Sequence, residues 1–294
     1  MLLGQARPGG LEVRELGETY HLALEKFYEK LIGENLHIAY SDRDLLMKYF
    51  DASIEEALDW LERKRGVNHG EFWEYEKKEI IFRLKKFFDK EIDRALKSKI
   101  DFVPHMVEAA FGMDDSNRAI SAPALKVTDG KRTVEFRGKI DRVDVAGGLS
   151  AIEDLEGKRN FVGVTARVID YKAGSTVIPS REANEGRNMQ LPIYALAVER
   201  CVMPGSKVSA GSYLSFMSGG SIGSLKFEQD QEDARGYVDI KRIEQLILDY
   251  VENMAKGVFT VKPSTASVCE RCDHKRVCRV SELRKGGEKN DLVN

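Results

Sequence analysis

Two aspartates and a lysine in the middle of the chain have the residue types and the spacing to bind a metal ion. Asp141 lies in one apolar-flanked segment, and Asp170 and Lys172 lie in a second one. Residues two apart in a β-strand project from the same face, so Asp170 and Lys172 point one way and Tyr171 the other. If the two segments pair as neighbouring strands, two carboxylates and one ammonium converge on one spot.

Two carboxylates held close together repel each other unless a cation lies between them. Oxygen ligands of this kind suit Mg²⁺ or Mn²⁺. A lysine beside such a metal can orient a water molecule and stabilise negative charge that builds up on a phosphate. The spacing of Asp141, Asp170 and Lys172 therefore predicts a divalent-metal site with an ammonium next to it.

This order, an aspartate followed by Asp-x-Lys, resembles the catalytic core of the PD-(D/E)xK nuclease superfamily. Residues 138–144 (GKIDRVD) and 169–174 (IDYKAG) look most like its RecB-type branch. That branch includes the nuclease domains of RecB and AddB and the CRISPR-associated exonucleases with an iron–sulfur cluster. A lone Asp-x-Lys is common by chance, and a salt-bridged strand end is its alternative interpretation. The further motifs described below favour the nuclease interpretation.

The composition limits the class of protein. The 294 residues carry a net charge of −2, so any nucleic-acid binding must come from a local patch rather than from the overall field. No apolar run is long enough to span a bilayer, and residues 1–10 lack the charged and apolar sections of a signal peptide. The chain is therefore expected to be a cytoplasmic protein with no membrane partner.

The first third of the chain is expected to be helical. Apolar residues recur at spacings of three and four in residues 16–31, 41–65 and 71–100, which is the period of an amphipathic helix. These helices should form a wall over one side of the metal site. For the lysines of the third helix, a solvated face is favoured over contact with DNA. These lysines are Lys77, Lys78, Lys85, Lys86 and Lys90.

His21 lies at the edge of the apolar stripe of the first helix. Its type and position alone indicate a partly buried histidine that hydrogen-bonds a neighbour. Residues 16–31 (LGETYHLALEKFYEKL), however, resemble the Gly-x-x-x-His helix that opens RecB-type nucleases, and His21 takes the place of their histidine metal ligand. Residues 102–113 (FVPHMVEAAFGM) resemble the segment in which a glutamate follows an apolar strand. Glu108 takes that place, with an ordinary strand-edge charge as the alternative.

Several strands are expected between residues 126 and 227. Alternation over residues 126–136 around Asp129-Gly130 predicts a type I′ hairpin that leads into the strand of Asp141. The Val- and Ile-rich residues 163–172 predict a central strand. Residues 208–217 and 225–227 predict further strands, and residues 239–254 predict an amphipathic helix.

A helix that carries two polar residues on one face is expected to begin close to Asn188, because Pro192 is tolerable only in the first turn. Gln190 and Tyr194 are four residues apart and so share a face. They match the Gln-x-x-x-Tyr motif of RecB-type nucleases, whose helix lies beside the active site. An amide and a phenol suit phosphate oxygens and can order the lysine. The alternative is a capping glutamine and a core tyrosine.

The four cysteines are bunched toward the C-terminus, which argues against a secreted disulfide framework and for metal or cluster ligation. Cys269, Cys272 and Cys278 have the spacing C-x₂-C-x₅-C, which resembles the C-terminal ligands of the [4Fe–4S] cluster in AddB-type nucleases. Those nucleases take a fourth cysteine from before their first helix. Here no cysteine precedes His21, so the chain is expected to start late or to be a piece of a longer one.

Other ligands for the cysteine segment are open. Cys201 is a substitute fourth cluster ligand, although it follows the Gln-x-x-x-Tyr helix. His274 completes a Cys₃His set for zinc with the three spaced cysteines. Three reduced, unoccupied thiols are the remaining alternative.

Together these features predict an α/β fold. Its core is restriction-endonuclease-like, with a mixed central β-sheet flanked by helices, a helical N-terminal part and a cysteine-bearing C-terminal extension. The expected division is residues 1–115 for the helical part with the histidine motif, 116–260 for the nuclease core and 261–294 for the cysteine tail, within one compact nuclease domain.

The resemblance implies a Mg²⁺- or Mn²⁺-dependent deoxyribonuclease, an exonuclease that acts on ends or single strands in DNA repair, recombination or CRISPR-type processing. It implies metal ligation by His21, Asp141, Asp170 and the Tyr171 carbonyl, with Glu108 as a further candidate. It implies catalytic roles for Asp141, Asp170, Lys172, Gln190 and Tyr194.

There are two alternatives: one belongs to another functional class, and the other differs only in its substrate. One is a non-catalytic DNA-binding or assembly module of a helicase–nuclease complex, since the chain has no P-loop and so no motor of its own. The other is an RNA nuclease. The expected partners are DNA and either a helicase or a CRISPR-associated protein.

Overall fold

Three long helices come first in the chain. The computed structural model describes residues 11–65, 72–113, 122–146, 161–227 and 236–278, apart from residues 262, 264 and 271. The helices are α1 (Val13–Gly33), α2 (Arg43–Arg65) and α3 (Phe72–Lys97). They confirm the helices that the apolar spacing predicts.

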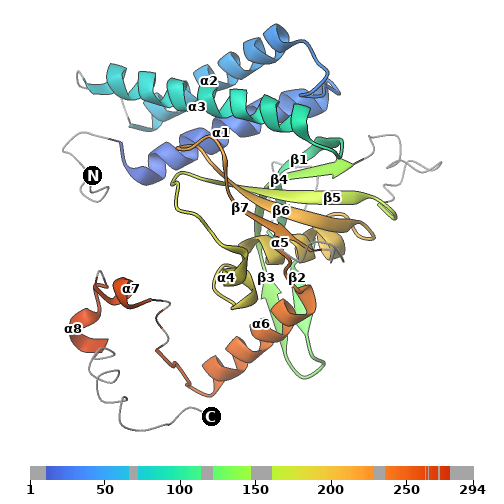
Figure 1. Cartoon of the computed structure of the whole chain (residues 1–294), viewed down its shortest axis with the longest axis vertical. Coiled ribbons are helices and arrows are strands. Elements are labelled where there is room, and N and C mark those ends of the chain that lie inside the picture. The colour runs from blue at the N-terminus through green and yellow to red at the C-terminus, as the bar shows by residue number, and fades with distance from the viewer. Residues whose placement is uncertain are drawn as a thin grey trace. The chain divides into compact units, whose positions relative to one another are not determined.

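A mixed five-stranded sheet follows, in the order β1-β4-β5-β6-β7 (Figure 1). Its strands are β1 (Phe102–Phe111), β4 (Gly138–Ala146), β5 (Thr165–Lys172), β6 (Lys207–Ser215) and β7 (Ser221–Lys226). β5 and β6 are parallel, whereas the other neighbours are antiparallel. The strand that carries Asp170 is thus central, as its Val- and Ile-rich sequence predicts.

The predicted hairpin is present, but its turn type is wrong. β2 (Leu125–Thr128) and β3 (Thr133–Phe136) form a separate two-stranded sheet. A type I′ turn needs positive φ at both central residues, and Gly130 has φ +84° whereas Asp129 is not in that region. Instead, Asp129 Oδ1 accepts bonds from the backbone N–H groups of Lys131 (2.9 Å) and Arg132 (2.8 Å). These side-chain bonds stabilise a wider loop over residues 129–132.

The other helices are α4 (Ser180–Asn184), α5 (Gln190–Ala197), the π-helix η2 (Val198–Val202) and α6 (Ile240–Ala255). α5 begins two residues after the predicted Asn188, with Pro192 in its first turn. It packs closely on the sheet because β6 carries a glycine there. A Cβ at Gly211 would lie 3.2 Å from Val168 and 3.3 Å from Leu191 of α5, so only glycine allows this approach without a shift.

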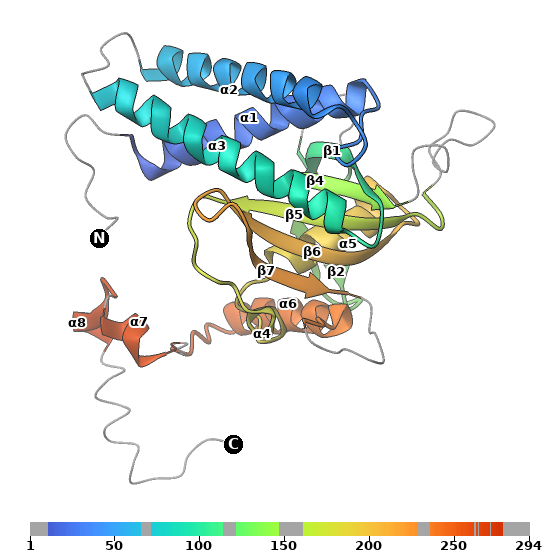
Figure 2. The same ribbon diagram turned by 45° about the horizontal axis from the view of Figure 1, so that its top comes forward.

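The sheet separates two apolar cores, and successive residues of β5 alternate between them. Ile169 and Tyr171 pack with the side chains of α1, α2 and α3, which cover one face. Ala166 and Val168 pack with α5, η2 and α6 on the other face. The three long helices therefore cover one side of the sheet (Figure 2).

The chain divides into two compact units, residues 1–248 and residues 249–294. The second unit contains α7 (Ala266–Glu270) and α8 (Lys275–Cys278). The three-part division given above stays a prediction. Among the helices in the described ranges, none is both long enough and apolar enough to cross a membrane.

Candidate active site

The antiparallel pairing of β4 and β5 brings the two predicted aspartates together. The register pairs Arg142 with Ile169, so Asp141 and Asp170 occupy the next facing positions. At this pair the bond between the strands is no longer backbone to backbone, because Asp141 Oδ2 accepts a hydrogen bond of 2.7 Å from the backbone N–H of Tyr171. A carboxylate takes the place of a backbone carbonyl and is thereby fixed at the end of the paired segment.

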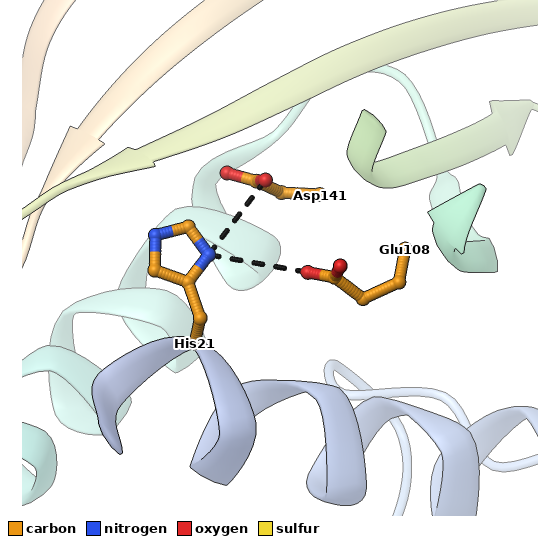
Figure 3. Close-up of side chains that lie close together, drawn as sticks. All are labelled: His21, Glu108 and Asp141. Atoms are coloured by element: carbon orange, nitrogen blue, oxygen red, sulfur yellow. Dashed lines mark ion pairs between the residues drawn. The ribbon is translucent and has the colours of Figure 1, made fainter. Parts of the chain in front are cut away.

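His21 on α1 forms a cluster with Asp141 and Glu108 (Figure 3). His21 Nδ1 lies 3.6 Å from Asp141 Oδ1 and 4.0 Å from Glu108 Oε1. One ligand atom from each of the three residues lies within 4.8 Å of the other two. An imidazole and two carboxylates, contributed by α1, β4 and β1, are a donor set that suits Mn²⁺ or Mg²⁺.

Glu108 owes its position to an unusual backbone conformation. Its φ is +46°, in a region that few residues other than glycine adopt. Val107 pairs with Arg142, so Glu108 lies opposite Asp141 in the register of β1 and β4. Strain of this kind persists only where the surrounding structure enforces it, and it gathers at functional sites. Here it accompanies a carboxylate directed at the cluster.

Lys172 connects the second aspartate to α5. Its Nζ lies 2.6 Å from Asp170 Oδ2 and donates to Gln190 Oε1 at 2.7 Å. Gln190 Nε2 donates in turn to the Tyr194 hydroxyl at 2.9 Å. Because an ammonium can only donate, it orients the amide with its oxygen toward Lys172 and its nitrogen toward Tyr194. The predicted Gln-x-x-x-Tyr pair and the lysine thus form one hydrogen-bonded row.

Burial changes the proton affinities of the site. Burial and the charge of Asp170 raise the pKa of Asp141 to about 8. Burial and the charge of Asp141 raise the pKa of Glu108 to about 7. Burial also raises the pKa of Asp170, against the opposing effect of Lys172. Burial lowers the pKa of His21, which favours the neutral imidazole that a metal needs. A cation would relieve the repulsion between these carboxylates.

Mg²⁺ or Mn²⁺ is therefore expected to raise the thermal unfolding midpoint, and Asp141→Asn is expected to abolish that rise. A ligand at about a hundred times its Kd stabilises the folded state by about 2.7 kcal/mol. Each kcal/mol raises the midpoint by about 2–4 °C in a domain of this size. Asparagine keeps an acceptor for the Tyr171 N–H and removes only the charge. Thermal melts with EDTA and with increasing metal measure the difference.

Asp129→Asn makes the same chemical change at the exposed hairpin loop and should leave the metal response unchanged. A metal response that persists in Asp141→Asn would contradict the site. So would a response that is lost in both variants.

Two of the predicted ligands have other neighbours in the structure. The Asp170 carboxylate is ion-paired with Lys172, its neighbour on the same face of β5, and it is outside the set gathered within 4.8 Å. The Tyr171 backbone lies close enough to the His21 imidazole to act on its pKa in the raising direction, against the effect of burial. Glu108, the further candidate, lies inside the set. Ligation by Asp170 and by the Tyr171 carbonyl stays a prediction.

The cysteines lie in both compact units. Cys201 is in η2, Cys269 is in α7, Cys278 is in α8 and Cys272 lies between these last two. All four are free thiols. Across the described ranges, the cluster at His21 is the one group of three or more histidine, cysteine or acidic side chains close enough to share an ion. The described tail therefore does not gather its thiols, and the iron–sulfur and zinc sites stay predictions.

A buried charge network lies behind the site, on the helical side of the sheet. Arg142 has an exposed fraction of only 1 %. Its guanidinium lies 2.8 Å from Asp144 Oδ1 and 2.7 Å from Glu91 Oε1, and donates to the Tyr171 hydroxyl at 3.0 Å. Arg142 follows Asp141 in the chain, so the network holds β4 and β5 together directly behind the acidic cluster.

The sequence indicates this network only in part. Arg142 and Asp144 are two residues apart in β4, so a cation and an anion share one face of that strand, which signals an ion pair where that face is buried. Their partner Glu91 is on α3, 51 residues away from Arg142. Periodicity gives no means of pairing residues at that distance.

Comparison with known proteins agrees with this geometry. The model of the PD-(D/E)XK nuclease superfamily matches residues 2–279. One of the subunits of the "ATP-dependent helicase/deoxyribonuclease" of Bacillus cereus (strain B4264) is 30% identical over 190 residues, which cover 63% of this chain and 14% of that protein. The subunit of the same name from Clostridium tetani (strain Massachusetts / E88) is 23% identical over 336 aligned residues, which cover 93% of this chain and 27% of that protein.

The matched region spans less than a third of the length of either relative. The family match, in contrast, extends over nearly all of this chain and includes both the acidic cluster and the lysine row. The chain therefore belongs to the PD-(D/E)XK nuclease superfamily.

Proposed function

We propose that this chain hydrolyses phosphodiester bonds of DNA with Mg²⁺ or Mn²⁺, as an exonuclease that acts on ends or single strands. One observation carries the proposal: the Asp170–Lys172 pair lies beside the cluster of His21, Glu108 and Asp141. The name of the two relatives, which includes "deoxyribonuclease", supports DNA as the substrate. DNA repair or recombination, and CRISPR-type processing, are the proposed settings.

The residues of the cluster fit a divalent ion. His21, Glu108 and Asp141 would hold it, and Asp170 is near enough to influence the pKa of both His21 and Asp141. A bound divalent ion supplies Lewis acidity toward the phosphate and lowers the pKa of a water molecule. Lys172 stabilises the charge that develops on the phosphate or orients the attacking water.

Tyr194 is suited to hold the substrate strand. Burial raises the pKa of its hydroxyl, so the phenol stays protonated at neutral pH. Its oxygen accepts the bond from Gln190, which leaves the phenol hydrogen to donate to a phosphate oxygen.

A cleft next to the cluster gives a strand room to enter. Its volume is about 450 Å³, and it runs from Glu108 along β1, with residues of the C-terminal half of α1 on its other side. β1 is the edge strand of the sheet, so no further strand closes this side within the described residues.

Cleavage of end-labelled DNA by the purified chain tests the proposal. Mg²⁺ or Mn²⁺ should support cleavage, EDTA should abolish it, and Asp170→Asn should reduce it by about 10²-fold or more, which is the scale for removing one transition-state interaction. Linear and circular single strands, duplexes and RNA of the same sequence separate end-dependent from internal cleavage and DNA from RNA. Equal cleavage by wild type and Asp170→Asn would identify a contaminant.

A non-catalytic module of a helicase–nuclease complex is the second candidate. The two relatives carry "helicase" in their name and are several times longer than this chain, which favours a helicase as the proposed partner. Metal-dependent stabilisation without cleavage of any substrate would support the module over the nuclease.

A further inference from the structure

One side of α3 carries a column of basic residues at spacings of three and four, so they share a face. They are Arg83, Lys86, Lys90, Arg94 and Lys97. Three of the five pair with acids of the same helix. Arg83 pairs with Glu79 at 2.6 Å, Arg94 pairs with Glu91, and Lys97 lies 3.9 Å from Asp93.

Lys86 and Lys90 differ from the rest of the column. Both are exposed, and neither forms an ion pair with a carboxylate in the described ranges. The acids around them have other partners: Asp89 pairs with Arg43 at 2.7 Å, and Glu91 pairs with Arg142 at 2.7 Å. The middle of α3 therefore presents two uncompensated positive charges on a chain whose net charge is −2.

These two lysines lie next to the β6–β7 turn. Gly219 of that turn, with φ +69°, packs against α3 so closely that a Cβ would lie 3.3 Å from Lys90 Cγ and 3.4 Å from the Lys86 carbonyl oxygen. The same segment is bonded to β5, because the Phe216 N–H donates to the Lys172 carbonyl at 3.0 Å. Figure 2 shows the turn reaching the middle of α3. One turn thus connects the lysines of α3 to the lysine of the site.

Aromatic contacts place the same part of α3 close to the metal cluster. Phe87, which follows Lys86, has its ring centroid 5.3 Å from that of Phe216. The Phe216 ring lies 5.9 Å from the imidazole of His21. Two ring contacts, through the buried Phe87 and Phe216, therefore separate the middle of α3 from the imidazole of the cluster.

We propose that Lys86 and Lys90 bind neighbouring phosphates of a single DNA strand and direct it to the metal cluster. Residues four apart on a helix have Cβ atoms about 5–6 Å apart, a separation similar to that of successive phosphates on a strand. Ammonium groups bind phosphates as point charges. The cluster itself is acidic and repels the backbone, so a local positive surface is needed to bring the strand in. The inference rests on the proposed nuclease function and adds the path of its substrate.

Binding of a fluorescent oligothymidylate to the full-length chain tests this path. EDTA suppresses cleavage, and anisotropy gives the Kd over a series of salt concentrations. Each phosphate contact with a single strand contributes about 0.7 to the slope of log Kd against log salt. The double variant Lys86→Gln/Lys90→Gln should therefore lower that slope by about 1.4 and weaken binding most at low salt.

Lys48→Gln/Lys78→Gln is the matched control. It removes the same charge from two exposed lysines, on α2 and about two turns earlier on α3. Its slope should equal that of the wild type. An unchanged slope in Lys86→Gln/Lys90→Gln would overturn the path, and so would an equal decrease in both double variants, because overall charge would explain it. If Lys86→Gln/Lys90→Gln lowers the slope but the wild-type chain cleaves no DNA, the binding of the strand by these lysines is supported and the proposed nuclease activity is rejected.

Discussion

Replacing Lys172 with methionine is expected to lower the rate of DNA cleavage by about 10²–10³-fold, the effect of losing one positioned group that stabilises transition-state charge. Methionine keeps much of the length of the side chain and removes its charge. The ammonium lies 2.6 Å from Asp170 and 2.7 Å from Gln190, so no other described cation takes the same position between the cluster and α5. Single-turnover cleavage with saturating Mn²⁺ measures the effect.

Lys172→Met should lower only the rate of cleavage and should leave metal binding unchanged. His21, Glu108 and Asp141 do not depend on Lys172 for their positions, so Lys172→Met should keep the metal-induced rise in the unfolding midpoint. Lys207→Met is the control, because Lys207 is an exposed lysine at the opposite end of the β5–β6 pair, roughly 20 Å away along the strands. A cleavage rate of Lys172→Met equal to that of the wild type would show that cleavage does not need this lysine.

Arg142→Met is expected to lower the free energy of unfolding by about 3–5 kcal/mol, which is the usual cost of removing one partner from a buried ion pair. The variant leaves Asp144 and Glu91 buried without the guanidinium that lies 2.8 and 2.7 Å from them. Urea unfolding at neutral pH measures the loss. Arg167→Met should cost less, because Arg167 is partly exposed and Asp144 keeps Arg142. Equal losses of unfolding free energy in the two variants would mean that the buried ion pairs of Arg142 stabilise the fold no more than the partly exposed ion pair of Arg167.

The pH dependence separates lost charge pairing from lost packing. Burial alone would raise the pKa of Glu91, but Arg142 and Arg94 outweigh burial and hold that pKa well below its ordinary value of 4.5. A lowered pKa in the folded state stabilises the fold above the unfolded value, and this contribution is lost as the pH falls. Glu91→Gln lacks it, so its difference in stability from the wild type should be large at neutral pH and shrink below about pH 4.5. A difference independent of pH would indicate packing alone.

Residue spacing predicts the parts of the fold that depend on local pattern. The three opening helices, the central position of β5 and the start of α5 near Pro192 all follow from periodicity, β-branched residues and the geometry of proline. Each of these features is decided by residues close in sequence or by one alternation rule.

The remaining features depend on long-range packing or on backbone conformations that no pattern announces. The resemblance of residues 102–113 names Glu108 as a candidate ligand, but nothing in that segment signals that Glu108 takes φ +46°. The partnership of Arg142 with Glu91 depends on how α3 lies on the sheet.

The alternation of side chains along β4 and β5 has a consequence for which sequence changes this chain can tolerate. Asp141 and Asp170 face one side of the sheet, and Arg142 and Tyr171 face the other. Inserting or deleting a single residue in either strand would move each set of side chains to the opposite face of the sheet. The acids would then point toward the guanidinium network, and Arg142 or Tyr171 would point toward the metal cluster. Length variation in evolution should therefore be confined to the connections, whereas these two strands should keep an invariant residue count even where their side chains diverge.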